Sequence, residues 1–206
     1  MRLLVWQLAA LLAGGAWLFG AGALAERRQA AACGVRCGTE RWAVKTLTDA
    51  DTGQIEPGDA ACSILALRQL HAPPRDSLPA DGRVPPLETH LCSVSADLVG
   101  WKLELGDSDF HLVIADPSDS NATMIAEIPA AGCARVCASP WHAEFARARA
   151  AVIAALGRPS IKYRRLSKRR PVSIVGVGFY DFIHGQTGVA PNGVELHPVL
   201  YIEFAP

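Results

Sequence analysis

The alternation of apolar and polar positions predicts one long strand over residues 88–105, and this alternation changes phase in the middle. Every even-numbered position from Cys92 to Leu98 is apolar, whereas from Trp101 to the end of the segment the odd-numbered positions are apolar. Strand side chains alternate with a period of two, so the flip requires one extra residue, and the nearby Gly100 favours a bulge. We therefore predict a bent strand that serves two faces of a barrel, with Leu98 and Trp101 both buried.

The rest of the C-terminal half is predicted to contain four further strands and one helix. Apolar runs predict strands at residues 110–115, 123–128, 172–180 and 195–204, and an N-cap with a first-turn proline opens a helix over residues 139–156. The order of strand, strand, strand, helix, strand, strand resembles the OB-fold, a five-stranded, partly open Greek-key barrel. We therefore predict a mainly β, OB-like domain with one or two helices over residues 88–206.

A cysteine-containing extension is predicted to precede this domain at residues 26–87. Its first half lacks a sustained period, apart from short apolar spacing at residues 42–47 that indicates at most one strand. Aliphatic residues at near-helical spacing behind Asp59 predict a short helix over residues 60–71. Five prolines then make residues 72–87 a linker, because proline supplies no backbone N–H for a helix or a sheet.

The first 25 residues have the features of an export signal. Arg2 precedes an uncharged stretch over residues 3–24, and Ala23-Leu24-Ala25 fits the small-x-small site of a signal peptidase. This stretch exceeds the roughly 7–15 residues of an ordinary signal core, so an uncleaved membrane anchor is the alternative. Both interpretations predict an exported bacterial protein that is secreted, periplasmic or anchored through its N-terminal segment.

Six cysteines follow this leader, an even number that favours disulfide bonds in an oxidising compartment. Two Cys-x3-Cys pairs, at residues 33–37 and 133–137, could each close a small loop or pair with each other across the fold. Six cysteines allow 15 connectivities, and the spacing selects none of them. Zinc binding is the alternative, although Cys-x3-Cys is an uncommon spacing for zinc.

Composition narrows the function only by exclusion. With 50% hydrophobic and 19% charged residues the chain has material for a folded core, and its formal net charge of +0 indicates no particular partner. The sequence contains no Gly-x-Ser-x-Gly, His-Glu-x-x-His, phosphate-binding-loop or dinucleotide glycine motif. No cofactor is therefore predicted, apart from the divalent metal considered below.

The glycine-rich loop over residues 184–193 is the most distinctive segment. Its glycines permit close backbone approach, and four of its side chains could meet a ligand or stabilise the loop itself: His184, Gln186, Thr187 and Asn192. In an OB-like barrel this loop joins the last two strands and is one of two loops used for ligands. An ordered connection whose side chains satisfy their own backbone is the alternative.

A longer run that includes this loop carries a family resemblance. From His184 to Leu200 the chain reads HGQTGVAPNGVELHPVL. Together with residues 110–113 and 124–127, this run resembles an uncharacterised family of exported bacterial proteins. The resemblance implies a location outside the cytoplasm and no catalytic role.

Imidazoles and carboxylates recur on the predicted strands. In two places an acid and a histidine stand two residues apart, so each pair shares a face of the sheet if its segment is extended. The candidate metal ligands are Asp109, His111, His184, Glu195 and His197, with Glu127 and Asp181 as further carboxylates. Such a set could bind a divalent ion or transfer protons near neutral pH. Hydrogen-bonded structural histidines are the alternative, because any half-polar strand shows the same spacing.

Seven bases and no acid occur between residues 158 and 170. Such a run could attract an anionic polymer or the surface of the cell envelope without reading any sequence. The candidate contacts are Arg164, Arg165, Arg169 and Arg170. A solvated loop that offsets acidic residues elsewhere is the alternative, because runs of charge are usually solvated.

These features together predict an exported OB-like barrel that binds an anionic polymer or a carbohydrate-like ligand. A metal-dependent hydrolase centred on His111, His184 and His197 is the first alternative. A structural protein of the cell envelope is the second. Convergence of the three histidines in the fold would favour the hydrolase.

Overall fold

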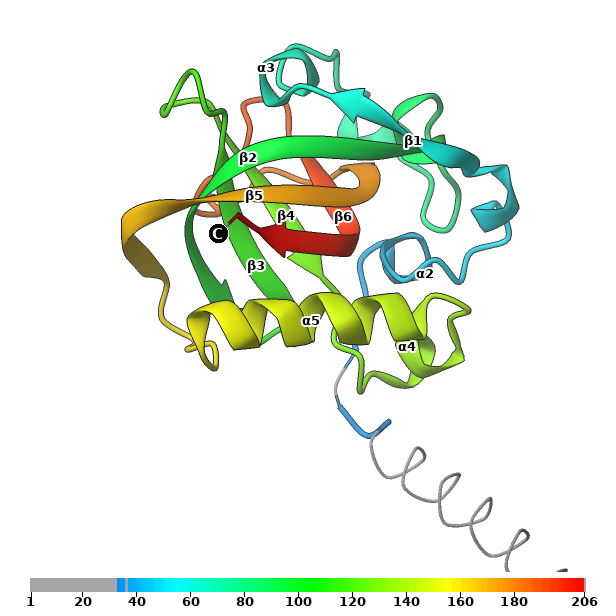
Figure 1. The fold of residues 1–206 in the computed structure, drawn as a ribbon. Coiled ribbons are helices and arrows are strands. Elements are labelled where there is room, and N and C mark those ends of the chain that lie inside the picture. Colours follow the sequence, from blue (N-terminus) through cyan, green and yellow to red (C-terminus); the bar gives the residue numbers. More distant parts are fainter. Residues whose placement is uncertain (1–32, 36, 206) are drawn as a thin grey trace, which may run out of the picture.

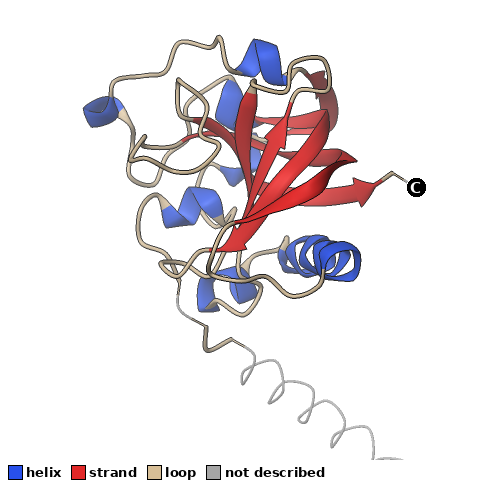
Figure 2. Cartoon of the chain, turned by 90° about the vertical axis from the view of Figure 1, so that its left-hand side faces the viewer, coloured by secondary structure: helices blue, strands red, loops and turns tan. Residues whose placement is uncertain are grey.

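The structure, a computed structural model, describes residues 33–35 and 37–205, and the predicted leader lies outside them. One six-stranded sheet forms the centre of the described part, with short helices around it (Figures 1 and 2). The prediction of a mainly β fold is confirmed, although the sheet has six strands and not five, because residues 56–62 add the strand β1, and the described residues contain four α-helices and not one or two. None of these described helices has the length and apolarity needed to cross a membrane.

The sheet consists of β1 (Glu56–Cys62), β2 (His90–Leu103), β3 (Phe110–Ala115), β4 (Thr123–Ile128), β5 (Arg164–Tyr180) and β6 (Val194–Phe204). These strands pair in the order β1-β2-β3-β4-β6-β5, and β2 also pairs with β5. The pairings therefore run from β2 through β3, β4, β6 and β5 back to β2. Two pairs are parallel, β1 with β2 and β4 with β6, and the others are antiparallel.

Strand β2 bends where the sequence predicts a bend. Its register against both β3 and β5 shifts between Leu98 and Gly100, so Val99 is the extra residue of a bulge. Leu98 is 0% exposed and Trp101 is 1% exposed, as predicted. A Cβ atom at Gly100 would lie 2.7 Å from the carbonyl oxygen of Arg164, so the close approach of β5 explains the glycine.

Helix α5 (His142–Leu156) packs against β6 and β4 and lies below the sheet in Figure 1. In Figure 2 it is seen end-on. The helix begins three residues after the predicted start at residue 139. The difference arises because a separate short helix, α4 (Ala134–Ala138), precedes it, and Ser139 and Pro140 belong to the turn between the two helices.

The N-terminal extension differs from the prediction in two places. Residues 42–45 form the helical turn α2 (Trp42–Lys45) and not a strand. Residues 60–62 belong to β1, so the helix predicted over residues 60–71 shrinks to α3 (Ile64–Leu67). Parallel pairing with β2 satisfies the backbone of residues 60–62 in an extended conformation, so the helix begins only after them. Three short 3₁₀ turns complete the described elements: η1 (Thr52–Gln54), η2 (Arg75–Ser77) and η3 (Leu87–Thr89).

Strand β5 begins at Arg164, eight residues before the predicted start at residue 172. This first part pairs with the bent half of β2, where Arg164 lies opposite Trp101. The pairing with β2 thus extends β5, and the local sequence gives no sign of this pairing. The hypothesis of a loop is therefore wrong for residues 164–170.

All six cysteines form disulfide bonds, as predicted. The bonds are Cys33–Cys137, Cys37–Cys133 and Cys62–Cys92. The two Cys-x3-Cys pairs therefore bond to each other across the fold, and the third bond ties β1 to β2. No thiolate is left for zinc, so the zinc alternative for these cysteines is wrong. Three disulfides indicate an oxidising environment outside the cytoplasm.

Candidate functional site

A pocket of about 350 Å³ opens between segments that are distant in the sequence. Its walls come from residues 37–45, from the β2–β3 loop, from strands β3, β4 and β6, and from the loop that joins β5 to β6. Six carboxylates line it: Glu40, Glu104, Asp107, Glu127, Asp181 and Glu195. The basic side chains that line it are Lys45, His111 and His184. The pocket is therefore acidic and attracts cations.

Strand register gathers the acids and histidines of three strands on one face. His111 lies directly opposite Glu127 in the antiparallel pair β3–β4. The parallel pair β4–β6 sets Ile125 opposite Glu195. Glu127 and His197 each stand two residues further along their strands, and a period of two keeps them on the same face. Spacing within each strand and pairing between strands thus combine into one cluster.

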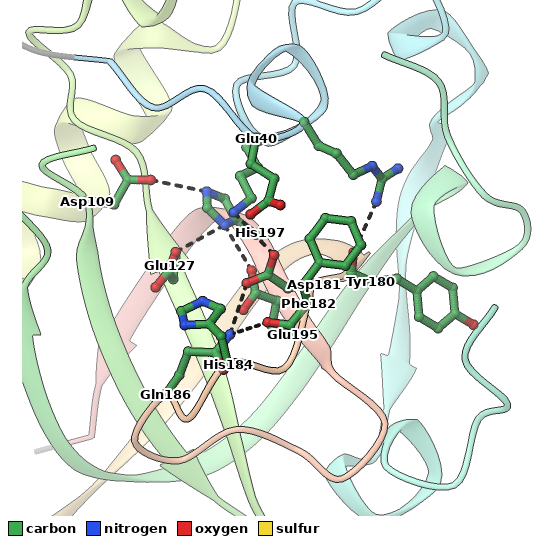
Figure 3. A network of polar contacts seen from close by, with 12 residues as sticks. Glu40, Asp109, Glu127, Tyr180, Asp181, Phe182, His184, Gln186, Glu195 and His197 are labelled. Atoms are coloured by element: carbon green, nitrogen blue, oxygen red, sulfur yellow. Dashed lines mark hydrogen bonds and ion pairs between the residues drawn. The ribbon is translucent and has the colours of Figure 1, made fainter. Parts of the chain in front are cut away.

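His197 lies at the centre of this cluster (Figure 3). Its Nε2 is 3.2 Å from Oδ2 of Asp109. Its Nδ1 is 3.0 Å from Oε1 of Glu195 and 3.2 Å from Oε2 of Glu127. The other oxygen of Glu127, Oε1, lies 2.7 Å from Nδ1 of His111. Glu127 therefore bridges two imidazoles and joins the buried Asp109 to the pocket wall.

The hydrogen bonds of His111 determine which ring nitrogen carries a proton. Its Nε2 lies 2.9 Å from the carbonyl oxygen of Thr187, and because a carbonyl can only accept, Nε2 must donate. Nδ1 then faces Oε1 of Glu127 at 2.7 Å and Oε1 of Glu104 at 3.6 Å. This nitrogen either carries a second proton or directs its lone pair toward a cation held by the two carboxylates.

Burial changes the charge state of two acids in the cluster. It raises the pKa of Asp109 to about 7, although the nearby imidazole of His197 acts in the opposite direction. Burial also raises the pKa of Glu195, and the negative charge of Asp181 acts in the same direction. Both carboxyl groups therefore hold a proton at a higher pH than exposed acids do.

Glu127 and His111 are shifted toward their charged forms. Burial would raise the pKa of Glu127, but the hydrogen bond with His111 and the nearby His197 and Lys45 outweigh it and lower the pKa to about 2. Burial would lower the pKa of His111, but the hydrogen bond with Glu127 and the charge of that carboxylate outweigh it, so the pKa is raised. Glu127 is thus the most firmly ionised carboxylate of the cluster.

Lys45, the last residue of helix α2, borders the cluster. Its Nζ lies 3.5 Å from Oδ1 of Asp181 and 5.1 Å from the ring centre of Phe179. Burial would lower the pKa of Lys45, but the surrounding carboxylates, led by Asp181 and Glu195, hold it above its usual value. Lys45 therefore remains a cation and balances part of the negative charge.

A buried ion pair holds α2 in this position. Arg41, which precedes α2, donates to the two carboxylate oxygens of Glu88 at 2.6 and 2.7 Å and to the carbonyl of Tyr180 at 3.1 Å. Glu88 also accepts from the backbone N–H of Tyr180 at 3.0 Å. Together with the disulfide bond at Cys37, this pair fixes Lys45 at the wall of the pocket.

The structure brings most of the predicted metal ligands together. Four of the five join the cluster: Asp109, His111, Glu195 and His197. His184 lines the pocket but makes no ion pair with these groups in the described part of the chain (Figure 3). Gln186 also lines the pocket and accepts from the backbone N–H of His184 at 2.8 Å.

The other predicted ligand-binding residues lie elsewhere. Thr187 contributes its carbonyl oxygen to His111. Asn192 donates to the carbonyls of Leu67 and Leu70, both at 2.9 Å, and so ties the loop to the end of α3. Such contacts are those of an ordered connection. The arginines Arg164, Arg165, Arg169 and Arg170 lie on β5 and do not line the pocket.

Sequence reasoning missed Glu104, Lys45 and Trp42, which also line the pocket. A signal existed for Glu104, since it occupies a polar position of the alternation that follows the bend in β2. For Lys45 and Trp42 there was none. They reach the pocket through a disulfide bond between residues 96 positions apart and through a buried ion pair.

Two groups of three side chains in the described part of the chain could hold a metal ion. The groups are Glu104 with His111 and Glu127, and Asp109 with Glu127 and His197. In each group the potential ligand atoms lie within 4.8 Å of one another. The second group is buried throughout, whereas all three residues of the first line the pocket. Only the first group can therefore present a bound ion to a substrate.

Comparisons with protein-family models, with curated proteins and with solved structures gave no match. The resemblance to a family of exported bacterial proteins therefore stays a prediction. The chemistry of the pocket has to be inferred from its own geometry.

Proposed function

We propose that this chain is an exported OB-like barrel whose acidic pocket binds a divalent metal ion at Glu104, His111 and Glu127 and forms the centre of a hydrolase. The orientation of His111 carries this proposal. With Nε2 donating to a backbone carbonyl, a bound ion would replace the proton on Nδ1, and the Nδ1 lone pair would then point at an ion held between the two carboxylates. Metal-ligating histidines are typically held by such a bond from their other nitrogen.

The separations between the ligand atoms are compatible with one ion, which would displace the Nζ of Lys102 from its ion pair with Oε1 of Glu104. Two ligands about 2.0–2.1 Å from a tetrahedral zinc ion lie about 3.3 Å apart. Nδ1 of His111 and Oε1 of Glu104 are 3.6 Å apart, close to this value. Nδ1 and Oε1 of Glu127 are 2.7 Å apart, so a bound ion would lengthen this contact by about 0.6 Å.

The strand pairings support the OB-like barrel. The circuit of the strands β2 to β6, with helix α5 between β4 and β5, corresponds to the predicted element order. The pocket is bordered by the β2–β3 and β5–β6 loops, which in an OB-like barrel are the two loops that hold ligands. Six carboxylates disfavour an anionic ligand in this pocket.

The surrounding residues can support hydrolysis. A bound divalent ion would supply a water molecule of lowered pKa. Contact of Oε2 with His197 orients Glu127, whose Oε1 remains directed at His111. Glu195 lines the pocket with a raised pKa and can donate a proton to a leaving group. Lys45 balances the charge of Asp181 beside it.

Calorimetric titration of chelator-treated protein with Zn²⁺ and with Mn²⁺ tests the proposal. We expect one ion per chain, and a loss of at least tenfold in affinity for His111→Ala and Glu104→Gln. His184→Ala is the matched control, because His184 lines the same pocket but belongs to neither group of ligands. Hydrolysis of uncharged ester substrates should then depend on the bound metal and on His111.

Two results would contradict this function. One is the absence of stoichiometric metal binding at millimolar concentration. The other is an equal loss of affinity in the His111 and His184 variants, which would place the ion elsewhere. Nitrogen NMR distinguishes the alternative role of His111, because an imidazolium paired with Glu127 keeps protons on both ring nitrogens when metal is added.

A further inference from the structure

A basic surface lies apart from the pocket, on residues 158–170. This segment, the basic segment, carries five arginines and two lysines without an acid. Its C-terminal part is the beginning of β5, where Arg164, Arg165, Lys168 and Arg169 are exposed. In Figure 1 this gold part of β5 lies on the opposite side of the molecule from α2, which lines the pocket.

Most of these charges lack a partner within the part of the chain that the structure describes. Arg169 has a carboxylate within 4 Å, Oδ2 of Asp97 at 3.8 Å. Arg170 lies over the ring of Phe204, with 5.4 Å between the guanidinium carbon and the ring centre. The other bases of the segment form no ion pair with described residues. The surface therefore keeps its positive charge available for another molecule.

The backbone presents these side chains outward. Arg165 lies opposite Gly100 and Arg170 opposite Leu98, so the residues between the two arginines bulge out of the ladder with β2. On its other side, β5 pairs with β6 only from Val172 onward. Charged side chains also protect a strand edge from aggregation, but that role favours lysine, whereas five of these seven bases are arginines.

We propose that the basic segment is a docking surface for a linear phosphate polymer. Five of its seven bases are arginines, whose planar guanidinium binds phosphate through two parallel hydrogen bonds. Seven bases within thirteen residues are more than a single small anion can neutralise, whereas they suit a polymer with repeated charges. This inference uses none of the residues of the proposed metal centre.

Fluorescence anisotropy with a labelled 20-nucleotide oligo-dT probe tests the proposal over a range of salt concentrations. The test variant is Arg164→Gln/Arg165→Gln/Lys168→Gln. The matched control, Arg75→Gln/Arg135→Gln/Arg147→Gln, removes the same charge from exposed arginines on other elements. We expect the test variant to bind at least tenfold more weakly at 50 mM salt, with the slope of log K against log salt reduced by about 2, whereas the control binds like the wild type.

Inorganic polyphosphate should displace the probe at a lower charge concentration than alginate, which carries carboxylates. Three results would overturn the proposal. The first is a lack of probe binding at 50 mM salt, and the second is an equal loss in both triple variants, which would indicate a response to net charge alone. The third is a stronger or equal response to another polyanion: alginate displaces the probe at least as well as polyphosphate does, or anionic phospholipid vesicles capture the protein at least as well.

Discussion

The glycine at the bend of β2 provides the sharpest test of the fold. A Cβ atom added at Gly100 would lie 2.7 Å from the carbonyl oxygen of Arg164 and in still closer contact with the Tyr163 hydroxyl. Real Cβ atoms essentially never come within 3.0 Å of another heavy atom, so β2 and β5 must move apart. Because overpacking at a well-packed site costs about 1–3 kcal/mol, we expect Gly100→Val to destabilise the protein by that amount.

Urea unfolding of the oxidised protein measures this cost. The matched control is Gly53→Val, because a Cβ atom at Gly53 meets no atom within 4 Å and the residue has no positive φ. For a chain of this size, a loss of 1 kcal/mol corresponds to about 2–4 °C in Tm. The control should remain within about 0.5 kcal/mol of the wild type.

A double variant separates the two clashes. Tyr163→Ala removes the side-chain clash but leaves the carbonyl of Arg164, so Gly100→Val should remain destabilising in that background, although by less. Full rescue would show that the backbone of β5 does not crowd the bend. Equal costs at Gly100 and Gly53, or no cost at Gly100, would refute the explanation of the bulge by close approach of two strands.

Two further predictions concern the thiols and the buried acid. Thiol titration of the denatured, unreduced protein should find no free sulfhydryl, because all six cysteines are bonded, and titration after reduction should find six sulfhydryls per chain. Four or more free sulfhydryls before reduction would contradict the pairing. Burial raises the pKa of Asp109 to about 7 from its ordinary 3.8, so the folded state binds the Asp109 proton more tightly than the unfolded state does. This proton therefore stabilises the fold fully below about pH 4, and the stabilisation is lost as the pH rises through 7. The side chain of Asp109→Asn does not titrate. In chelator-treated samples, the free energy of unfolding of this variant relative to the wild type should therefore rise by up to about 1.4 kcal/mol per pH unit between pH 4 and 7. Parallel pH curves of the two proteins in urea unfolding would exclude this effect.

Local pattern was sufficient for the strands β2, β3, β4 and β6 and for the bend. A period of two in the apolar positions indicates a strand with one buried face. This period involves residues only two positions apart, so it can be recognised in the sequence. The flip at Gly100 was therefore visible in the sequence, and so were the paired positions of Asp109 with His111 and of Glu195 with His197. Local pattern was misleading at residues 60–62 and incomplete at Arg164, where pairing with β2 decided the conformation.

Convergence of the site was beyond the sequence. His111 meets Glu127 only because β3 and β4 pair in one register, and a shift by one residue would turn either side chain to the opposite face. Glu195 joins them through a parallel pairing of strands some 70 residues apart, for which the local sequence holds no signal.

The sequence by itself determined the mainly β class, the bent strand, the even set of cysteines and the candidate acids and histidines, because each depends on residue type and short-range spacing. Tertiary structure alone decided which cysteines bond, that Lys45 and Glu104 reach the pocket, and that the basic segment lies apart from it. Those outcomes depend on contacts between residues far apart in the chain, and such contacts follow from the packing of the whole core and from no local period.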